Sequence, residues 1–296
     1  MPLSDLVDNV PEVLTRWPGK PLLSERDPNS FAHLLTLAEV NALVDAHCLA
    51  ARNVVLLKDG EIIGRETYVS GDMPRPGAIR AHLDQGGTIT LRDLQALKPA
   101  VSRLRDEIRQ ETGCRVHINA YMTPPGGHGL TYHYDPYATL IIQVAGRKAW
   151  PLHPPVVRNP MGEHGAFEER GFTREEWQWL ATTPPAQTIT LEPGRVLWLP
   201  RGYIHAPYTV GEETSLHLTV ALKERTRHWL AERVAAEVLA QALVDPALRA
   251  EVPPAELLDA PGSAIERART YLLGALLTMT PDDVAGLVRR TAKGVA

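Results

Sequence analysis

The sequence predicts an α+β protein in which a barrel or double-sheet jelly roll is flanked by helices at both ends. Helix start signals recur in residues 1–112. Short strand-like runs separated by Pro and Gly fill residues 113–225, a spacing typical of closed or double-layered β folds. Helical periodicity then continues through residues 226–296. We therefore expect a mixed N-terminal part, a β core and a helical C-terminal region within these bounds.

The first 112 residues contain signals for two helix starts, one hairpin and one helix end. Helices are predicted after Thr36 and after Thr90, because an acidic residue stands three positions later in each case. Asp59-Gly60 lies between two apolar or β-branched runs, which predicts a hairpin. The helical segment RDEIRQETG ends at Gly113, a residue type that favours helix C-termini.

The central region contains the predicted strands, with turns at PPGG, AGR and EPG. The strand segments are VHINAYM, TYHYDPYATLIIQVAG, KAWPLH, QTITLEPGRVLWLP and SLHLTVAL. A helical insert is expected to interrupt them, because Thr173 is followed by Glu176 before an apolar run. In the C-terminal region, apolar residues recur every four positions from Leu230, and Thr280 precedes Pro281 and two acids at a predicted helix start. This region is expected to pack on the barrel or on a twin subunit.

Composition and net charge give no sign of a disordered, nucleic-acid-binding or membrane-spanning protein. Of the 296 residues, 44% are hydrophobic and 22% charged, as in ordinary globular proteins. The net charge of -4 gives no basic footprint for nucleic acid, and no apolar stretch could span a membrane. The N-terminus lacks a signal-peptide pattern, so a cytoplasmic location is expected. Cys48 and Cys114 lack metal or redox spacing and are interpreted as reduced thiols.

The apolar, aromatic-rich segment TYHYDPYATLII contains an imidazole and a carboxylate, His133 and Asp135, with one residue between them. Both groups are costly to remove from water. In a strand, His133 and Asp135 would point to the same face, into whatever the sheet encloses. The two side chains could instead hydrogen-bond to each other or face solvent. An HxD pair alone does not distinguish these alternatives from metal binding. His205 follows a strand, a Pro and a Gly, and supplies a third donor. Two imidazoles and one carboxylate can form the facial triad of non-haem Fe(II), although Mn or Ni would also suit these donors.

Further polar residues are candidates for the same cavity. Lys148 follows the Ala145-Gly146 turn, and its ammonium could hold the distal carboxylate of 2-oxoglutarate, or be a solvated lysine. Asn119 and Tyr121 alternate on an earlier strand and could bind that carboxylate or be satisfied core residues. His217 is expected to face the cavity, because its apolar neighbours occupy the opposite strand face.

Two further observations suggest residues that contact the substrate. In a strand, Tyr137 would point to the same face as His133 and Asp135, so it is a candidate substrate contact, with a packed core tyrosine as the alternative. Arg201 and Arg147 stand near the expected cavity mouth and could meet an acidic substrate, or could be solvated surface residues.

These motifs, in this order, resemble the JmjC-like cupin proteins, and in particular the ribosomal oxygenase group of protein hydroxylases. The likeness covers about residues 15–225 and rests on RWPGKPLL, LLKDGEII, NAYMTPPGGHGLTYHYD, QVAGRKAWPL, LEPGRVLWLPRGYIHA and SLHLTV. It implies a double-stranded β-helix that uses Fe(II), 2-oxoglutarate and O2. The residues to which it assigns roles are His133, Asp135 and His205 for iron, Lys148, Tyr121 and Asn119 for 2-oxoglutarate, and His217 beside the cofactor or substrate.

The chain also departs from the family pattern. Ala138 stands where the family often has an acid, and the insert between the second and third ligands is long. The tail is shorter than the dimerisation and winged-helix regions of larger ribosomal oxygenases, so dimerising helices alone, and hence a homodimer, are expected.

The expected function is hydroxylation of a side chain, most simply at a β-carbon, of a peptide or protein substrate. That substrate would be a ribosomal protein or a ribosomally made natural-product precursor peptide. A small-molecule hydroxylase and a lysyl demethylase are alternatives of the same chemistry. A non-oxygenase cupin would more often present HxH with a later Glu and His, and a non-catalytic relative would have lost a ligand or the lysine.

Overall fold

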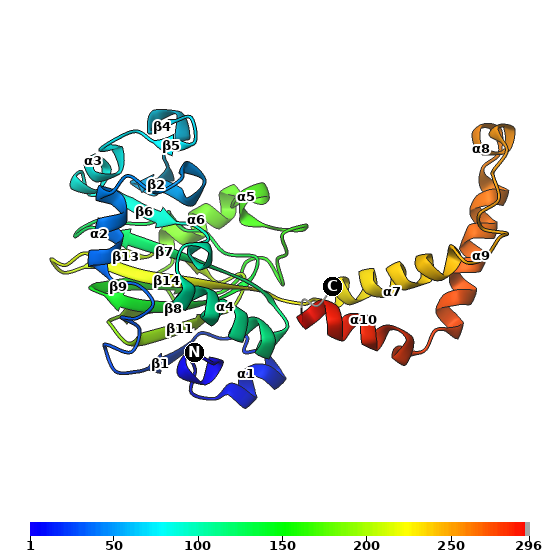
Figure 1. The fold of residues 1–296 in the computed structure, drawn as a ribbon, viewed down its shortest axis with the longest axis horizontal. Coiled ribbons are helices and arrows are strands. Elements are labelled where there is room, and N and C mark those ends of the chain that lie inside the picture. Colours follow the sequence, from blue (N-terminus) through cyan, green and yellow to red (C-terminus); the bar gives the residue numbers. More distant parts are fainter. Residues whose placement is uncertain (294–296) are drawn as a thin grey trace. The chain divides into compact units, whose positions relative to one another are not determined.

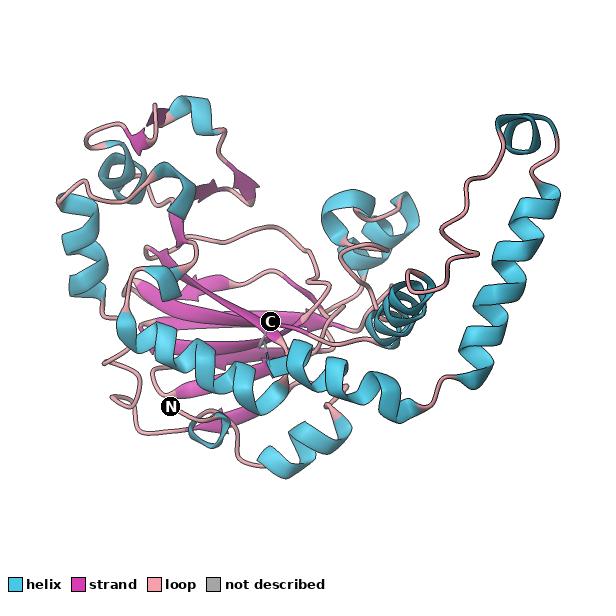
Figure 2. Ribbon diagram, turned by 45° about the vertical axis from the view of Figure 1, so that its right-hand side comes forward, coloured by secondary structure: helices cyan, strands magenta, loops and turns pink. Residues whose placement is uncertain are grey.

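The strands of the chain form two main antiparallel sheets, which together make the predicted jelly roll (Figures 1 and 2). The computed structural model describes residues 1–293. The larger sheet has the order β1-β11-β8-β14-β7-β6-β2-β3, and the smaller has β10-β9-β12 with β13 also paired to β9. The strands are β1 (Leu22–Glu25), β2 (Val54–Lys58), β3 (Glu61–Ile62), β4 (Val69–Ser70), β5 (Met73–Pro74), β6 (Thr88–Leu91), β7 (Arg115–Thr123), β8 (Ala138–Ala145), β9 (Arg147–His153), β10 (Gln187–Leu191), β11 (Arg195–Leu199), β12 (Ile204–His205), β13 (Tyr208–Val210) and β14 (Ser215–Lys223).

Helices precede, interrupt and follow these sheets, which confirms the predicted α+β architecture. The α-helices are α1 (Val10–Arg16), α2 (Leu37–Asp45), α3 (Ala78–Asp84), α4 (Pro99–Thr112), α5 (Phe167–Arg170), α6 (Arg174–Thr182), α7 (Arg227–Ala242), α8 (Pro254–Asp259), α9 (Gly262–Thr278) and α10 (Pro281–Lys293). Short 3-10 helices lie at Leu3–Asp5, Ala51–Asn53, Arg65–Thr67 and Leu94–Ala96. None of the helices within residues 1–293 is both long and apolar enough to cross a membrane.

Strand β14 shows how the sequence separates core from cavity. It lies between β7 and β8, and residues two apart point to the same face. Leu216, Leu218 and Leu222 belong to the large apolar core. His217 and Thr219, on the alternate positions, line a cavity on the other face. The β-strand period therefore directs the polar residues of this strand toward the candidate site.

Several local predictions are confirmed. Thr36 and Glu39 form a reciprocal capping box at the start of α2. In the hairpin between β2 and β3, Asp59 and Gly60 have φ values of 52° and 85°, a conformation that favours Gly, Asn and Asp. Helix α4 ends where Gly113 adopts the left-handed conformation, with φ of 68°.

The helix start predicted at Thr90 is wrong. Thr90 lies within β6, where it pairs with Val55 of β2 and Tyr121 of β7, and only a 3-10 turn follows at Leu94. The threonine and the acid three positions later match a capping box by sequence alone. Pairing on both sides of the strand overrides that local signal.

The continuous strand predicted from Thr131 is also only partly correct. Strand β8 begins at Ala138, and the preceding segment is irregular apart from a bridge between His133 and His205. His133 and Asp135 therefore do not occupy a regular strand.

The chain divides into two units, Met1–Glu224 and Arg225–Ala296. The first contains both sheets and α1 to α6, and the second contains α7 to α10. Within the second unit α10 and α9 each contact α7, and α8 contacts α9. Few of its described apolar side chains are buried, notably Val238 and Val284.

Candidate functional site

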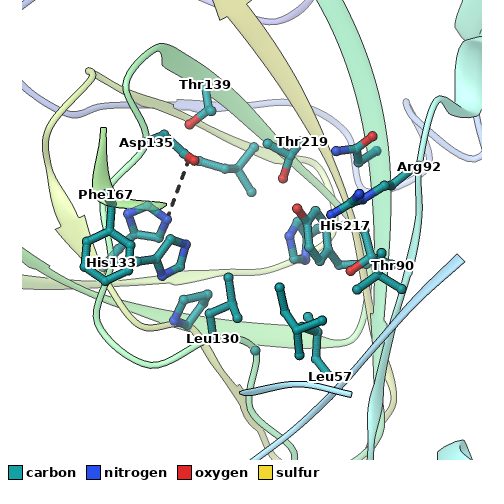
Figure 3. Close-up of a pocket in the computed structure, with 18 of the residues that line it drawn as sticks. Leu57, Thr90, Arg92, Leu130, His133, Asp135, Thr139, Phe167, His217 and Thr219 are labelled. Atoms are coloured by element: carbon teal, nitrogen blue, oxygen red, sulfur yellow. Dashed lines mark ion pairs between the residues drawn. The ribbon is translucent and has the colours of Figure 1, made fainter. Parts of the chain in front are cut away.

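A cavity of about 510 Å³ lies within the first unit and collects side chains from both sheets. Figure 3 shows part of its lining, with His133, Asp135 and Phe167 on one side and Arg92 and Leu57 on the other. All the predicted site residues except Arg201 and Arg147 line this cavity. Those residues are Asn119, Tyr121, His133, Asp135, Tyr137, Lys148, His205 and His217.

The backbone holds the three predicted metal ligands together. His133 N donates to His205 O at 3.2 Å, and His205 N donates to His133 O at 2.9 Å. Gly202 N donates to Asp135 O at 2.9 Å. Two segments separated by about seventy residues are thus joined at the positions that carry the imidazoles and the carboxylate.

The three side chains are neighbours, but they are not already arranged as a metal shell. The His133 and His205 rings are 4.3 Å apart between centroids, and His205 Nε2 lies 3.9 Å from Asp135 Oδ2 (Figure 3). Among residues 1–293, no three or more His, Cys, Asp or Glu side chains are grouped closely enough to hold a metal ion. Metal binding therefore requires the three side chains to draw together.

The hydrogen bonds of the two imidazoles suit metal ligands. His133 Nδ1 lies 2.8 Å from Thr131 O, and His205 Nδ1 lies 2.9 Å from Tyr203 O. A carbonyl partner requires Nδ1 to carry the proton, which leaves Nε2 free to coordinate. Burial also lowers the pKa of His205 to about 3, so this imidazole is neutral at physiological pH. The donor chemistry therefore fits a divalent metal.

Asp135 has the environment of a carboxylate that needs a cation. Burial raises the pKa of Asp135, while the neighbouring His133 acts in the opposite direction. Glu168 adds a further negative charge nearby and raises the pKa of Asp135 as well. A bound metal ion would offset both unfavourable contributions.

Lys148 is a buried cation whose charge is not balanced by an anion in the structure. Its side chain is 1% exposed, and Nζ donates to Thr123 Oγ1 at 2.8 Å. No carboxylate among the described residues forms an ion pair with it. Burial lowers the pKa of Lys148 to about 7. An anionic ligand at this end of the cavity would restore the ammonium form.

The other predicted cofactor residues line the same cavity as this lysine. The Tyr121 and His217 rings are stacked, with centroids 4.9 Å apart. Burial raises the pKa of Tyr121 to about 12, so its hydroxyl remains a hydrogen-bond donor. Asn119 Oδ1 accepts a hydrogen bond from Asp93 N at 3.1 Å, so this amide is held by the backbone at the edge of the cavity.

Arg201 lies outside the cavity. It lines a separate pocket together with Trp17, Tyr203 and Glu224, and its Nη1 is 3.4 Å from Pro160 O. Although Arg201 is only four residues from His205 in the sequence, its side chain enters a different pocket.

The sequence reasoning missed several residues that line the cavity. Trp150 and His117 could have been found, because each is two positions from a predicted residue on the same strand, Lys148 and Asn119 respectively. Arg92, Phe167 and Glu168 also line it. Phe167 and Glu168 lie on the short helix α5 in the insert, where no periodic signal marks them.

The fold and site define a jelly roll of the cupin class, with imidazoles and a carboxylate gathered inside it. Residues 90–230 match the JmjC domain, and all the cavity residues predicted from the sequence lie within this range. The resemblance seen in the sequence motifs is thereby confirmed.

Relatives and solved structures agree with this assignment. The chain is 30% identical over 219 residues to a bifunctional lysine-specific demethylase and histidyl-hydroxylase NO66 of Aedes aegypti, covering 72% of this chain and 33% of that one. It is 29% identical over 255 residues to ribosomal oxygenase 2 of Rattus norvegicus, covering 80% and 50%. The X-ray structure of E. coli ycfD superposes with a TM-score of 0.55 at 19% identity, covering 94% and 70%. The chain thus spans about a third to a half of the length of these curated relatives.

Proposed function

We propose that the chain is an Fe(II)- and 2-oxoglutarate-dependent dioxygenase that hydroxylates a side chain of a peptide or protein. The observation that carries this proposal is the reciprocal backbone pairing of His133 and His205 beside Asp135, in the same cavity as the buried Lys148. Three donors and an unbalanced cation in one cavity suit a metal-chelating dicarboxylate, which has one end for the metal and one for the cation.

His133, Asp135 and His205 would hold the iron, and Lys148 with Tyr121 would hold the distal carboxylate of 2-oxoglutarate. The names of solved relatives support this choice of cofactors. One structure of YcfD, a ribosomal oxygenase from E. coli, is a complex with cobalt and 2-oxoglutarate, with 20% identity and a TM-score of 0.52. When bound, iron and 2-oxoglutarate supply the oxidation of a C–H bond by O2, coupled to release of succinate and CO2. The surrounding barrel positions the target bond and excludes other partners.

The relatives favour a peptidic substrate. Their names include ribosomal oxygenases and a histidyl-hydroxylase, so a ribosomal protein is the first substrate to test. A ribosomally made natural-product precursor peptide is the second. We further propose that a β-carbon is hydroxylated. Lysyl demethylation, which the name of the Aedes relative also includes, and small-molecule hydroxylation are alternatives of the same chemistry.

The test is oxygen-dependent succinate formation after anaerobic reconstitution with Fe(II) and 2-oxoglutarate, with and without candidate peptides. We expect turnover in the wild type, its loss in His133→Ala and a sharp fall in Lys148→Ala. Mass spectrometry of the peptide distinguishes a gain of 16 Da from a loss of a methyl group. Unchanged turnover in either variant would refute the assigned roles, and absence of metal binding by the wild type would favour a non-catalytic protein of the same fold.

We also propose that residues 225–293 pair with a second copy of this chain. In this region Leu239, Val244, Leu258 and Leu277 are 57%, 77%, 79% and 86% exposed. A unit of this size that buries so few apolar side chains lacks a sufficient core of its own. A twin helical unit presents the same kind of surface and can cover it.

Analytical ultracentrifugation tests this homodimer. We expect the wild type to sediment as a dimer and Leu258→Lys with Leu277→Lys to sediment as a monomer. The control is Leu97→Lys, which changes an exposed leucine of the first unit and should leave the dimer intact. A wild type that is monomeric at all concentrations would exclude the dimer.

A further inference from the structure

Arg92 is a second cation that lines the candidate cavity, in addition to Lys148. It directly follows β6, and Figure 3 shows its side chain pointing into the cavity from the side opposite His133 and Asp135. Lys148 is buried, whereas Arg92 is exposed to solvent. The cavity therefore has one cation in its interior and one where a ligand can arrive from solvent.

The backbone of Arg92 is fixed, although its side chain is exposed. Arg92 N donates to Asn53 O at 2.8 Å, and Asn53 Nδ2 donates to Arg92 O at 3.1 Å. Asn53 is itself 7% exposed, at the end of the 3-10 helix that precedes β2. A buried amide thus holds the main chain of Arg92 at the edge of the cavity and leaves the guanidinium free.

The charge of this guanidinium is not balanced by a neighbouring acid. Among residues 1–293, no carboxylate forms an ion pair with Arg92. Asp93 is next to it in the chain, but its carboxylate accepts from Gln95 Nε2 at 3.0 Å. The N–H donors of the guanidinium are therefore available to a ligand.

The cofactor does not supply an anion for Arg92. 2-Oxoglutarate has two carboxylates, of which one chelates the metal in the proposed function and the other binds Lys148. The cavity, at about 510 Å³, is far larger than 2-oxoglutarate, so it also has room for part of a substrate. Any carboxylate that reaches Arg92 therefore belongs to the substrate.

The wall around Arg92 is suited to a peptide. Val55 and Leu57 of β2 and Ile62 of β3 line the cavity on the sheet that contains β6, and Ile62 is 58% exposed. An arginine beside apolar side chains can bind a carboxylate through two parallel hydrogen bonds while the apolar groups pack on the rest of the ligand.

We propose that Arg92 is a specificity-determining residue that binds an acidic side chain, Asp or Glu, of the substrate close to the residue that reacts. This inference rests on the proposed function, because it assumes a peptide substrate and 2-oxoglutarate on Lys148. Arg92 takes the role that the sequence suggested for Arg201 and Arg147, neither of which lines the cavity.

A library of short synthetic peptides with randomised sequences serves as the probe. The peptides are passed over immobilised protein loaded with cobalt(II) and 2-oxoglutarate, and those retained are sequenced by mass spectrometry, so that no turnover is needed. Arg92→Met keeps the apolar stem and removes the charge, and Arg92→Glu reverses it. The matched control is Arg103→Met, at an exposed arginine of α4 outside the cavity.

We expect the wild type and Arg103→Met to retain peptides enriched in Asp and Glu. The enrichment should disappear in Arg92→Met and change to Lys and Arg in Arg92→Glu. Because Arg92 is exposed, a single acidic peptide should bind Arg92→Met about 2- to 5-fold more weakly than the wild type, and less so at high salt. Replacing the acid of that peptide with its amide should remove the difference between the two proteins.

Isothermal titration of 2-oxoglutarate into the cobalt-loaded proteins separates substrate binding from cofactor binding. We expect Arg92→Met to bind 2-oxoglutarate as the wild type does, and Lys148→Met to bind it much more weakly. A loss in Arg92→Met as large as that in Lys148→Met would make Arg92 a cofactor residue and would overturn the inference.

The remaining contrary results distinguish this inference from the proposed function. If the wild type binds cobalt and 2-oxoglutarate but retains no peptides, or if Arg92→Met keeps the enrichment in acids, the role of Arg92 is wrong while the cofactor assignment stands. If the wild type binds neither cobalt nor 2-oxoglutarate, the proposed function fails and the inference fails with it.

Discussion

His133 and His205 exchange both of their backbone hydrogen bonds, at 3.2 and 2.9 Å, although about seventy residues separate them in the chain. Their rings consequently lie 4.3 Å apart between centroids. Each Nδ1 faces a backbone carbonyl, from Thr131 and Tyr203 respectively. The backbone thus fixes both the spacing of the two imidazoles and the nitrogen that each presents to a ligand.

This relationship predicts that metal should stabilise the protein only when both imidazoles are present. We expect cobalt or manganese to raise the melting temperature of the wild type by several degrees, because a ligand that binds only the native state stabilises it. His205→Ala should abolish this rise. Differential scanning fluorimetry with and without EDTA measures it, and His82→Ala, at a histidine outside the cavity, is the control. An equal rise in His205→Ala would place the metal elsewhere.

The burial of Lys148 predicts a pH-dependent cost to stability. Its pKa falls from the ordinary 10.5 to about 7 in the folded chain, so the unfolded chain binds more protons between these values. The cost is therefore fully present below pH 7 and is relieved as pH rises toward 10.5. Lys148→Met keeps the apolar stem and removes the charge, while Thr123 retains a donor in Thr88.

We accordingly expect Lys148→Met without cofactor to unfold at higher urea concentration than the wild type at pH 7, by an amount on the order of a few kcal/mol. The advantage should shrink steadily toward pH 10. Lys98→Met, at a surface lysine paired with Glu39, should show no such gain. A difference that does not change with pH would mean that burial of the charge is not its cause.

Sequence reasoning located the inner residues of the site because strand alternation is a local rule. Asn119 and Tyr121 on β7, Lys148 on β9 and His217 on β14 line one cavity, as their parity predicted. Trp150, two positions after Lys148 on β9, follows the same rule and lines the same cavity.

The residues that were misplaced depend on tertiary contacts that no local pattern encodes. Arg201 precedes Gly202, whose φ of 84° turns the chain, and the arginine enters a different pocket. Thr90 carries a helix-start signal but is held in a strand by neighbours on both sides. Phe167 reaches the cavity from an insert whose position depends on aromatic packing around Tyr134 rather than on periodicity.

The capping box at Thr173 predicts local rather than global destabilisation when it is removed. Its side chain accepts from Glu176 N, and the Glu176 carboxylate accepts from Thr173 N. Helix α6 contributes Leu180 to a small apolar cluster separate from the main core. Thr173→Ala should therefore cost about 1 kcal/mol and speed hydrogen exchange in α6 far more than in β14. Thr183→Ala, at the other end of the helix, is the control. Equal acceleration of hydrogen exchange in α6 and in β14 would show that the helix does not unfold independently of the main core.

The turn between β8 and β9, which delivers Lys148 to the cavity, requires glycine. Gly146 has φ of 59°, and a Cβ there would lie 2.4 Å from Thr214 O, a backbone atom that cannot move aside. Gly126 has a similar φ of 70°, but a Cβ there would meet nothing within 4 Å. Gly126→Ala should therefore cost only about 1 kcal/mol, the strain of a left-handed alanine. Gly146→Ala adds a steric clash and should cost at least about 3 kcal/mol in urea unfolding. Equal losses of unfolding free energy in the two variants would show that the backbone at Thr214 can move away, so that its close approach does not require glycine at position 146.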